Sequence, residues 1–170
     1  EGQEAAIRRI LSDRPRSHDK LVVGIPRGLA TTRLMTLPTK DRKVIQKSVA
    51  FELEDDLPVE LHDVIFDAAV IQSQGAGSTV YTAVALKKDL VVLLSQLQEL
   101  GLDPDMITTE GWAASQLLAR SVPENLAGAP ICVINLGARQ TVFHMMVAQR
   151  PVLSHTVPVG GDHVTRAIAA

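Results

Sequence analysis

Two glycine-containing segments combine residue types that could bind a phosphate group. Residues 135–141 read Asn-Leu-Gly-Ala-Arg-Gln-Thr, and residues 160–165 read Gly-Gly-Asp-His-Val-Thr. A tight turn between two strands exposes backbone N–H groups, and glycine lets an anion approach them closely. A glycine pair at a helix N-terminus offers further free N–H donors. The segments predict a phosphate cradle, whereas the alternative is a hairpin turn followed by an ordinary helix start. The residues that would form the cradle are Gly137, Thr141, Gly160, Gly161 and Thr165.

Four acidic residues gather at the end of a predicted helix, and basic residues at positions 40, 42 and 43 lie at its start. This order opposes the helix macrodipole, at about 0.3–1 kcal/mol for each badly placed charge. One interpretation is internal salt bridges or plain solvent exposure. The other is a docking surface for a basic partner. The acidic residues are Glu52, Glu54, Asp55 and Asp56.

The remaining reactive residue types show no spacing that indicates a catalytic or metal site. His144 and His155 fall in adjacent predicted strands and could face each other, but a hydrogen-bonded histidine within a sheet is favoured over a metal ligand. Cys132 lies in an apolar run and is expected to be a small buried side chain. Trp112 is expected in the core or between subdomains. The chain has no Gly-x-x-x-x-Gly-Lys loop, Gly-x-Ser-x-Gly elbow or His-Glu-x-x-His motif, so conventional hydrolases have no support.

The composition is that of a globular domain with an aliphatic core. Of 170 residues, 46% are apolar and 21% charged, but only 3% are aromatic. A net charge of -2 without a basic block gives no support for nucleic-acid binding. One cysteine cannot form an internal disulfide, which favours a reducing compartment. No apolar run approaches the ~20 residues of a membrane span, and both ends fall within expected helices, as in a fragment of a longer protein.

Hydrophobic periodicity and turn residues predict a mixed α/β (α+β) order without regular βαβ units. Asp41 is expected to cap a helix, and Gly101 to end another. The segment 75–78 is expected to form a hairpin connection. The expected helices cover residues 4–11, 40–54, 90–100 and 112–120, with a last one that begins at Gly160 and Gly161. The expected strands cover residues 21–25, 31–37, 64–72, 79–86, 131–136, 142–147 and 152–157.

The ordered set of these pieces resembles the PilM and GspL family of type IV pilus and type II secretion proteins. The turn at Gly137 and Thr141, followed by the pair at 160–161 and by Thr165, resembles the second phosphate loop of the actin-like ATPase fold. Residues 25–26, 37–38, 51–58 and 97–104 resemble further family segments in the same order. The resemblance implies an actin-like (ribonuclease H-like) fold with an inserted small subdomain of strand, strand, helix, strand and strand.

The resemblance also implies a division of the chain. Residues 1–20 would end a first actin-like segment. Residues 21–104 would hold the inserted subdomain and its following helix, and residues 105–170 the return to the actin-like body and the start of its second half. Asn135 replaces the acid that the family motif normally has, and a neutral amide holds Mg²⁺ less well. The first phosphate loop and the adenosine pocket have no counterpart here, so no cofactor is expected in this fragment, although ATP and Mg²⁺ stay open for the parent protein.

The function that the resemblance implies is that of a non-enzymatic scaffold at the cytoplasmic face of the inner membrane. It would link a secretion or pilus assembly ATPase to a PilN-like or GspM-like inner-membrane protein, without inserting into the membrane itself, and a homodimer is possible. The alternative is a nucleotide-dependent switch that binds ATP between its two halves. A slight preference for GspL over PilM rests on Asn135 and on the sequence Phe-Glu-Leu-Glu at residues 51–54.

Overall fold

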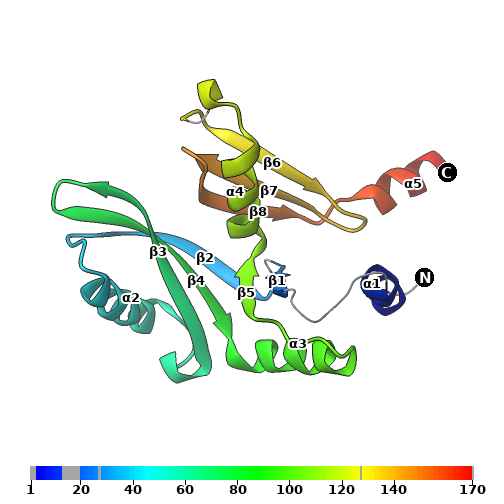
Figure 1. Cartoon of the computed structure of the whole chain (residues 1–170), viewed down its shortest axis with the longest axis horizontal. Helices are drawn as coiled ribbons and strands as arrows, with labels where there is room; N and C mark the ends of the chain where they lie inside the picture. Colours follow the sequence, from blue (N-terminus) through cyan, green and yellow to red (C-terminus); the bar gives the residue numbers. More distant parts are fainter. Residues whose placement is uncertain (1–2, 13–19, 27, 127, 170) are drawn as a thin grey trace.

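The computed structural model describes residues 3–12, 20–26, 28–126 and 128–169. Their strands form three small sheets that meet around the centre of the molecule (Figure 1). The helices are α1 (Gln3–Ser12), α2 (Arg42–Asp56), α3 (Lys87–Glu99), α4 (Glu110–Ser121) and α5 (Gly161–Ala169), with short 3-10 turns at Leu61–Asp63 and Glu124–Leu126. The strands are β1 (Val22–Ile25), β2 (Ala30–Leu37), β3 (Val64–Gln74), β4 (Gly77–Leu86), β5 (Met106–Thr109), β6 (Ile131–Leu136), β7 (Thr141–Val147) and β8 (Arg150–Val157).

The first three-stranded sheet has the order β2-β4-β3 and is covered on one face by α2. The helix places a buried residue at every fourth position, and these side chains pack on the valines of β4. Asp41 caps the helix by accepting hydrogen bonds from the backbone N–H groups of Lys43 and Val44, as expected. The resulting core is aliphatic, as the composition predicts. Its buried members are Leu37, Ile45, Val49, Leu53, Val64, Val80 and Val84.

Two predicted boundaries are confirmed by their turn geometry. The hairpin between β3 and β4 turns through Gly75, at a positive φ of 57°, and Ala76, whereas Gly77 and Ser78 of the expected connection already belong to β4. Gly101, with φ of 73°, lies just past the end of α3, where the N–H of Leu102 bonds to the carbonyl of Leu97. In that arrangement backbone N–H groups donate hydrogen bonds to carbonyl groups that the helix itself leaves without a partner. Glycine adopts the required backbone conformation without strain.

Strand β5 is an element that the sequence analysis did not predict. It pairs in parallel with β1, so that Ile25 lies beside Thr109. Strand β1 therefore belongs to a sheet with β5, and not to the sheet of β2, β3 and β4 with which the sequence analysis grouped it. The division of the chain at residues 20 and 104 stays a prediction.

The last sheet is the antiparallel meander β6-β7-β8, in which three expectations are wrong. Its second turn lies at Ala148 and Gln149, both at positive φ, so β8 begins at Arg150 and not at the expected residue 152, and Pro151 falls inside the strand at a bulge. His144 pairs with Ser154 and is buried, whereas His155 lies on the opposite, exposed face, because successive strand residues alternate in direction. Cys132 is exposed, since it shares this open face with the exposed Met145.

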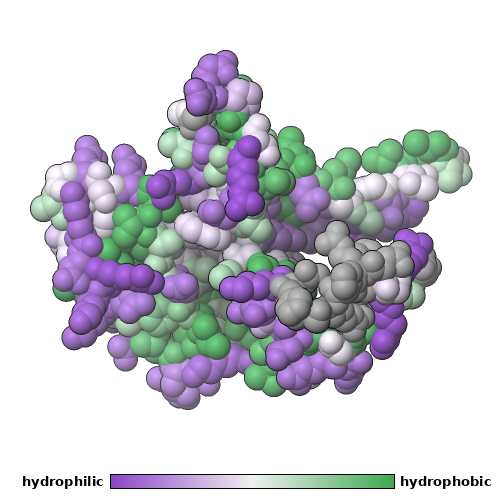
Figure 2. Space-filling view, viewed as in Figure 1, coloured by the Kyte–Doolittle hydropathy of each residue, from purple (hydrophilic) through white to green (hydrophobic). Residues whose placement is uncertain are grey.

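Helix α5 extends away from the meander and presents apolar residues on its surface (Figures 1 and 2). Val164 and Ile168 are 56% and 82% exposed. Among the described residues, no helix has both the length and the apolar character needed to cross a bilayer.

Candidate partner-binding groove

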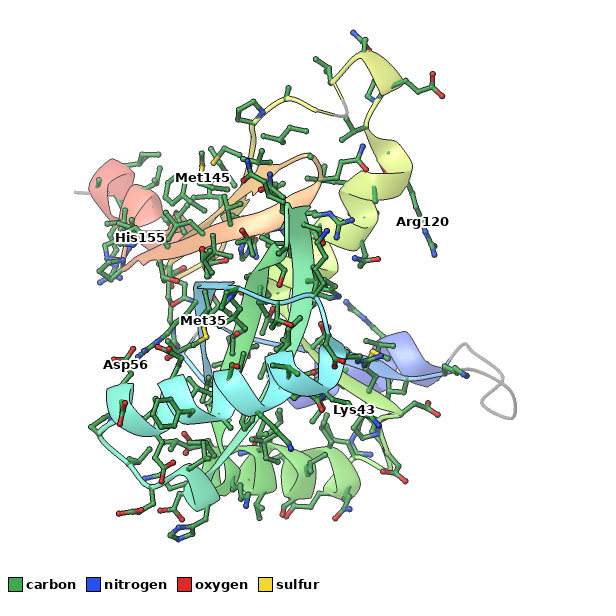
Figure 3. The ribbon with its side chains drawn as sticks, turned by 90° about the vertical axis from the view of Figure 1, so that its left-hand side faces the viewer. Met35, Lys43, Asp56, Arg120, Met145 and His155 are labelled. Atoms are coloured by element: carbon green, nitrogen blue, oxygen red, sulfur yellow. The ribbon has the colours of Figure 1, made fainter. Side chains whose placement is uncertain are left out.

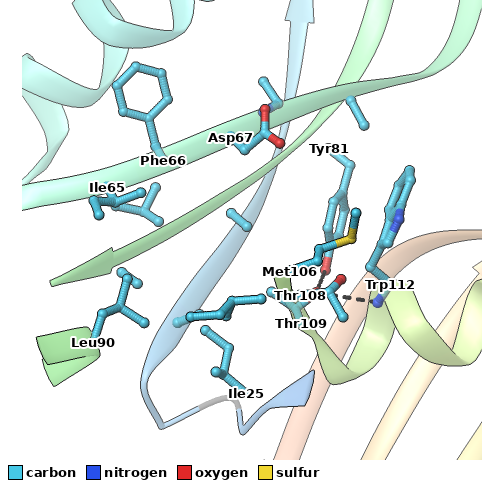
Figure 4. Close-up of a pocket in the computed structure, with 17 residues that line it drawn as sticks. Ile25, Ile65, Phe66, Asp67, Tyr81, Leu90, Met106, Thr108, Thr109 and Trp112 are labelled. Carbon is cyan, nitrogen blue, oxygen red and sulfur yellow. Dashed lines mark hydrogen bonds between the residues drawn. The ribbon is translucent and has the colours of Figure 1, made fainter. Parts of the chain in front are cut away.

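A groove of about 400 Å³ lies between the face of the β2-β4-β3 sheet that α2 leaves uncovered and the segment formed by β5 and the start of α4 (Figure 4). The alternation along β4 explains why this space is open. Val80 and Val84 pack on α2, so Tyr81, Ala83 and Ala85 point to the other face. Alanine side chains are too short to reach β5, and the floor of the groove is therefore hollow.

The wall opposite this floor is an edge strand. β5 pairs with β1 on one side, and among the described strands it has no partner on the other. All four of its residues, Met106 to Thr109, line the groove. Contacts with all four residues place β5 along the groove, where Ile25 of the paired strand β1 also lines it. An edge presents backbone N–H and C=O groups that another extended chain can pair with.

Two aromatic rings close one end of the groove. Trp112 of α4 stacks on Tyr81 of β4, with ring centroids 5.7 Å apart and planes at 29°. The hydroxyl of Thr109 accepts a hydrogen bond from the backbone N–H of Trp112 at 3.3 Å and lies 3.4 Å from the Tyr81 hydroxyl (Figure 4). Thr109 is thus the N-cap of α4 and fixes the helix against the sheet. Trp112 is half-buried in this contact, and its expected place between subdomains stays a prediction.

A buried polar cluster lies next to these rings and joins α4 to the meander. His144 Nδ1 and Ser154 Oγ are 2.9 Å apart, and both residues are buried. A Cβ at Gly111 would come within 2.8 Å of Ser154 Oγ and 3.2 Å of His144 Nδ1. Glycine at this position therefore permits the close approach of the helix. Glu110 adds a carboxyl group whose Oε2 is buried without a hydrogen-bond partner in the described part of the chain, and burial raises the pKa of Glu110.

The two predicted phosphate-binding segments do meet, but through their own backbones. The N–H of Gly161 donates to the carbonyl of Gly137 at 2.9 Å, and the N–H of Asp162 donates to Ala138 at 2.8 Å. These are two of the first N–H groups of α5, which a phosphate would otherwise bind. The glycine-rich helix start is therefore docked on the hairpin turn.

The other residues of the predicted cradle also have structural partners or lie apart. Thr141 donates its hydroxyl hydrogen to the carbonyl of Val159 at 2.6 Å. A Cβ at Gly160 would lie 2.6 Å from the Ala138 carbonyl oxygen, so this glycine allows close packing. Thr165 is exposed on α5. A role in phosphate binding stays a prediction.

The predicted acidic docking residues divide into two groups. Asp56 accepts a hydrogen bond from Arg33 in an ion pair of 2.6 Å, which fits the internal salt-bridge interpretation. Glu52, Glu54 and Asp55 are exposed. Their role in docking stays a prediction.

No sequence pattern indicated the groove, because β5, which forms its wall, was not predicted. Residues 106–109 are a β-prone run that follows Pro104 and ends at a helix-capping threonine, but none of the four is buried. The run is only four residues long, so periodicity could not identify it. No sequence feature indicated that Glu110 is partly buried, because its burial depends on the approach of the meander.

The chain matches known proteins along nearly its whole length. A family model described as type IV pilus assembly protein PilM matches residues 2–170. The structure is similar to the PilM-PilN type IV pilus biogenesis complex, with a TM-score of 0.78 at 19% identity, covering 98% of this chain and 50% of that one. No curated protein matches the sequence.

Two further solved structures are similar at lower scores. The cytoplasmic domain of EpsL, an inner-membrane component of the type II secretion system of Vibrio cholerae, gives a TM-score of 0.60 at 14% identity, over 98% of this chain and 60% of that one. A Bacteroides thetaiotaomicron protein with an actin-like ATPase fold and unknown function gives 0.44 at 8%, over 99% and 61%. This chain thus spans about half of the PilM chain that it matches. The predicted fold is confirmed, and the chain belongs to the PilM family of type IV pilus assembly proteins.

Proposed function

We propose that the chain is a scaffold domain of a type IV pilus or type II secretion assembly machine, and that its groove binds the cytoplasmic tail of a PilN-like inner-membrane protein in extended form. The observation that carries this proposal is the edge of β5, which has no partner among the described strands, beside a mainly apolar floor. The activity is protein docking and not catalysis.

An extended peptide fits this groove by adding a strand to β5. Its backbone would pair with the free edge, and alternate side chains would enter the hollow over Ala83 and Ala85. Four strand residues span about 13 Å, so the site would hold a short tail. The volume of about 400 Å³ falls in the range of ligand pockets lined by apolar residues with few polar groups.

The relatives support a partner of this kind. The PilM structure that this chain resembles is a complex with PilN, and EpsL is a component of the inner membrane. A scaffold that captures such a tail would work at the cytoplasmic face of the inner membrane. It could there hold an assembly ATPase beside a PilN-like or GspM-like protein. The nucleotide-dependent switch is less favoured, because the donors of Gly161, Asp162 and Thr141 are already bonded within the chain.

The test is to fill the groove without changing the fold. Ala83→Leu places a larger side chain on the floor, so we expect it to weaken binding of a synthetic tail peptide at least about tenfold, which is ~1.4 kcal/mol. Isothermal titration calorimetry measures this affinity, and circular dichroism confirms the fold. The matched control is Ala113→Leu, which adds the same atoms at an exposed position of α4. Wild-type affinity in the Ala83→Leu variant would refute the proposed site.

A further inference from the structure

The outer face of α2 carries exposed apolar side chains in a line. Its inner face is buried through Ile45, Val49 and Leu53. On the opposite side Phe51 is 65% exposed and Val44 is 45% exposed. These two residues are seven positions apart, about two helical turns, and therefore lie above one another on the same stripe. Single exposed apolar residues are common, but an aligned pair with phenylalanine defines a small apolar strip.

The charges beside this strip are separated by sign along the helix. Lys43 and Lys47 lie in its N-terminal half, and Glu54 and Asp55 lie in its C-terminal half; all four are exposed. By helical spacing they share the outer face with Phe51. Figure 3 shows Lys43 and Asp56 near the two ends of the helix. In the described part of the chain, the four outer-face charges form no ion pair, whereas Asp56 is paired with Arg33 on the inner side.

This charge order is unfavourable for a single helix. Cations near the N-terminus and anions near the C-terminus both oppose the macrodipole. A second helix laid antiparallel on the first reverses the situation, because each basic half then faces an acidic half. The surface is therefore complementary to itself, which is the requirement for an interface with two-fold symmetry.

We propose that the outer face of α2 binds the same face of a second copy of this chain, with the two helices antiparallel. In this arrangement the two-fold axis lies near the middle of α2, and Phe51 of each copy packs beside Phe51 of the other. Lys43 and Lys47 of one copy face Glu54 and Asp55 of the other. The groove takes no part, so this inference does not depend on the proposed tail-binding site.

The size of the strip determines the strength of the contact. A helix of 15 residues is about 22 Å long, and one such face buries less than the ~1,200 Å² of a stable interface. We expect a weak, transient dimer. Its charged contacts are screened beyond about 8 Å at about 0.15 M salt, so the dimer should weaken as salt is raised. Weak self-association becomes effective when several copies are held together at one machine.

Charge reversal on one copy at a time tests the arrangement. The variant Lys43→Glu/Lys47→Glu makes the whole face acidic, and Glu54→Lys/Asp55→Lys makes it basic. Each variant alone should be monomeric by sedimentation velocity of the full chain, because like charges face each other. An equimolar mixture should form a one-to-one complex at least about tenfold tighter than the wild-type dimer at low salt, since both halves now attract. The fourfold variant with all charges exchanged should recover self-association.

The apolar contribution is tested by Phe51→Ala, which should weaken the wild-type dimer about tenfold or more. The matched control is Val91→Ala on α3, where the replaced side chain is 60% exposed and lies outside the strip. Circular dichroism establishes that each variant is folded. A wild-type chain that stays monomeric at about millimolar concentration would overturn the proposal. A mixture of the two charge variants that stays monomeric would also overturn it. So would the finding that the acidic half binds a basic segment of another protein and does not bind a second copy of this chain.

Discussion

Glu110 occupies an unusual position for a carboxylate. It begins α4 directly after the capping residue Thr109, which is favourable for a negative charge at a helix N-terminus. The same position brings it beside the buried pair of His144 and Ser154, where one carboxylate oxygen has no hydrogen-bond partner in the described structure. Desolvation outweighs the helix dipole here, because burial raises the pKa of Glu110 above its ordinary value of 4.5.

This direction predicts how stability depends on pH. A raised carboxyl pKa means that the folded state binds the proton more tightly than the unfolded state does. The contribution of Glu110 to stability is therefore fully present below pH 4.5, and it is lost as the pH rises through the raised pKa. Glu110→Gln should melt at a higher temperature than the wild type at neutral pH, and the difference should vanish near about pH 4. The exposed Glu99→Gln serves as a control, and an equal effect at both positions would contradict the assignment.

At the residue level, the helix caps were predicted from sequence, whereas the exposure and orientation of side chains in the meander were not. The caps at Asp41 and Gly101 depend on bonds within the nearest turns, so their residue types indicate them directly. The exposure of Cys132 and the opposite orientation of His144 and His155 depend on which face of the meander α4 covers. A single strand sequence does not contain that information.

At the level of elements, α3 depends on residues that are neighbours in sequence, whereas β5 depends on a distant segment. Helix α3 was predicted because its periodic leucines and its terminal glycine are contiguous in sequence. Strand β5 is four residues long and is stabilised by β1, whose partner positions precede it by 84 residues. Pairings at such separation leave almost no local trace, and the groove was missed together with the strand that bounds it.

The docking of α5 on the β6-β7 hairpin leads to a prediction at this scale. A side chain at Gly160 would overlap the carbonyl oxygens of Gly137 and Ala138, which are backbone atoms that cannot move aside easily. Gly160→Ala should therefore lower the free energy of unfolding by about 1–3 kcal/mol, as overpacking does. Gly128→Ala is the matched control, because a Cβ at Gly128 meets no atom within 4 Å. Urea unfolding measures both, and equal stabilities would show that the turn and helix are not docked.

At the level of the whole molecule, the β2-β4-β3 sheet separates two proposed binding surfaces. Its one face, over Ala83 and Ala85, is the floor of the groove. Its other face packs on α2 through Val80 and Val84, and the outer side of α2 carries Phe51. The charge pattern of the sequence offered the acidic end of this helix as a docking surface for a basic partner, as one of two interpretations. The orientation of each charge relative to the buried face appears only in the fold.

This separation predicts that tail binding and self-association are independent. Substitutions at distant sites without shared partners usually add within about 0.3–0.5 kcal/mol, which is roughly a twofold change in affinity. Phe51→Ala should therefore leave the dissociation constant for the tail peptide within about twofold of wild type. Ala83→Leu should leave the dimer dissociation constant equally unchanged, and saturating peptide should not alter the sedimentation of the wild-type chain. Because coupling between two binding events is reciprocal, a peptide that changed the dimer constant would itself bind the dimer with altered affinity. Such coupling would contradict two independent surfaces and would identify β4, the strand common to both, as the element that connects them.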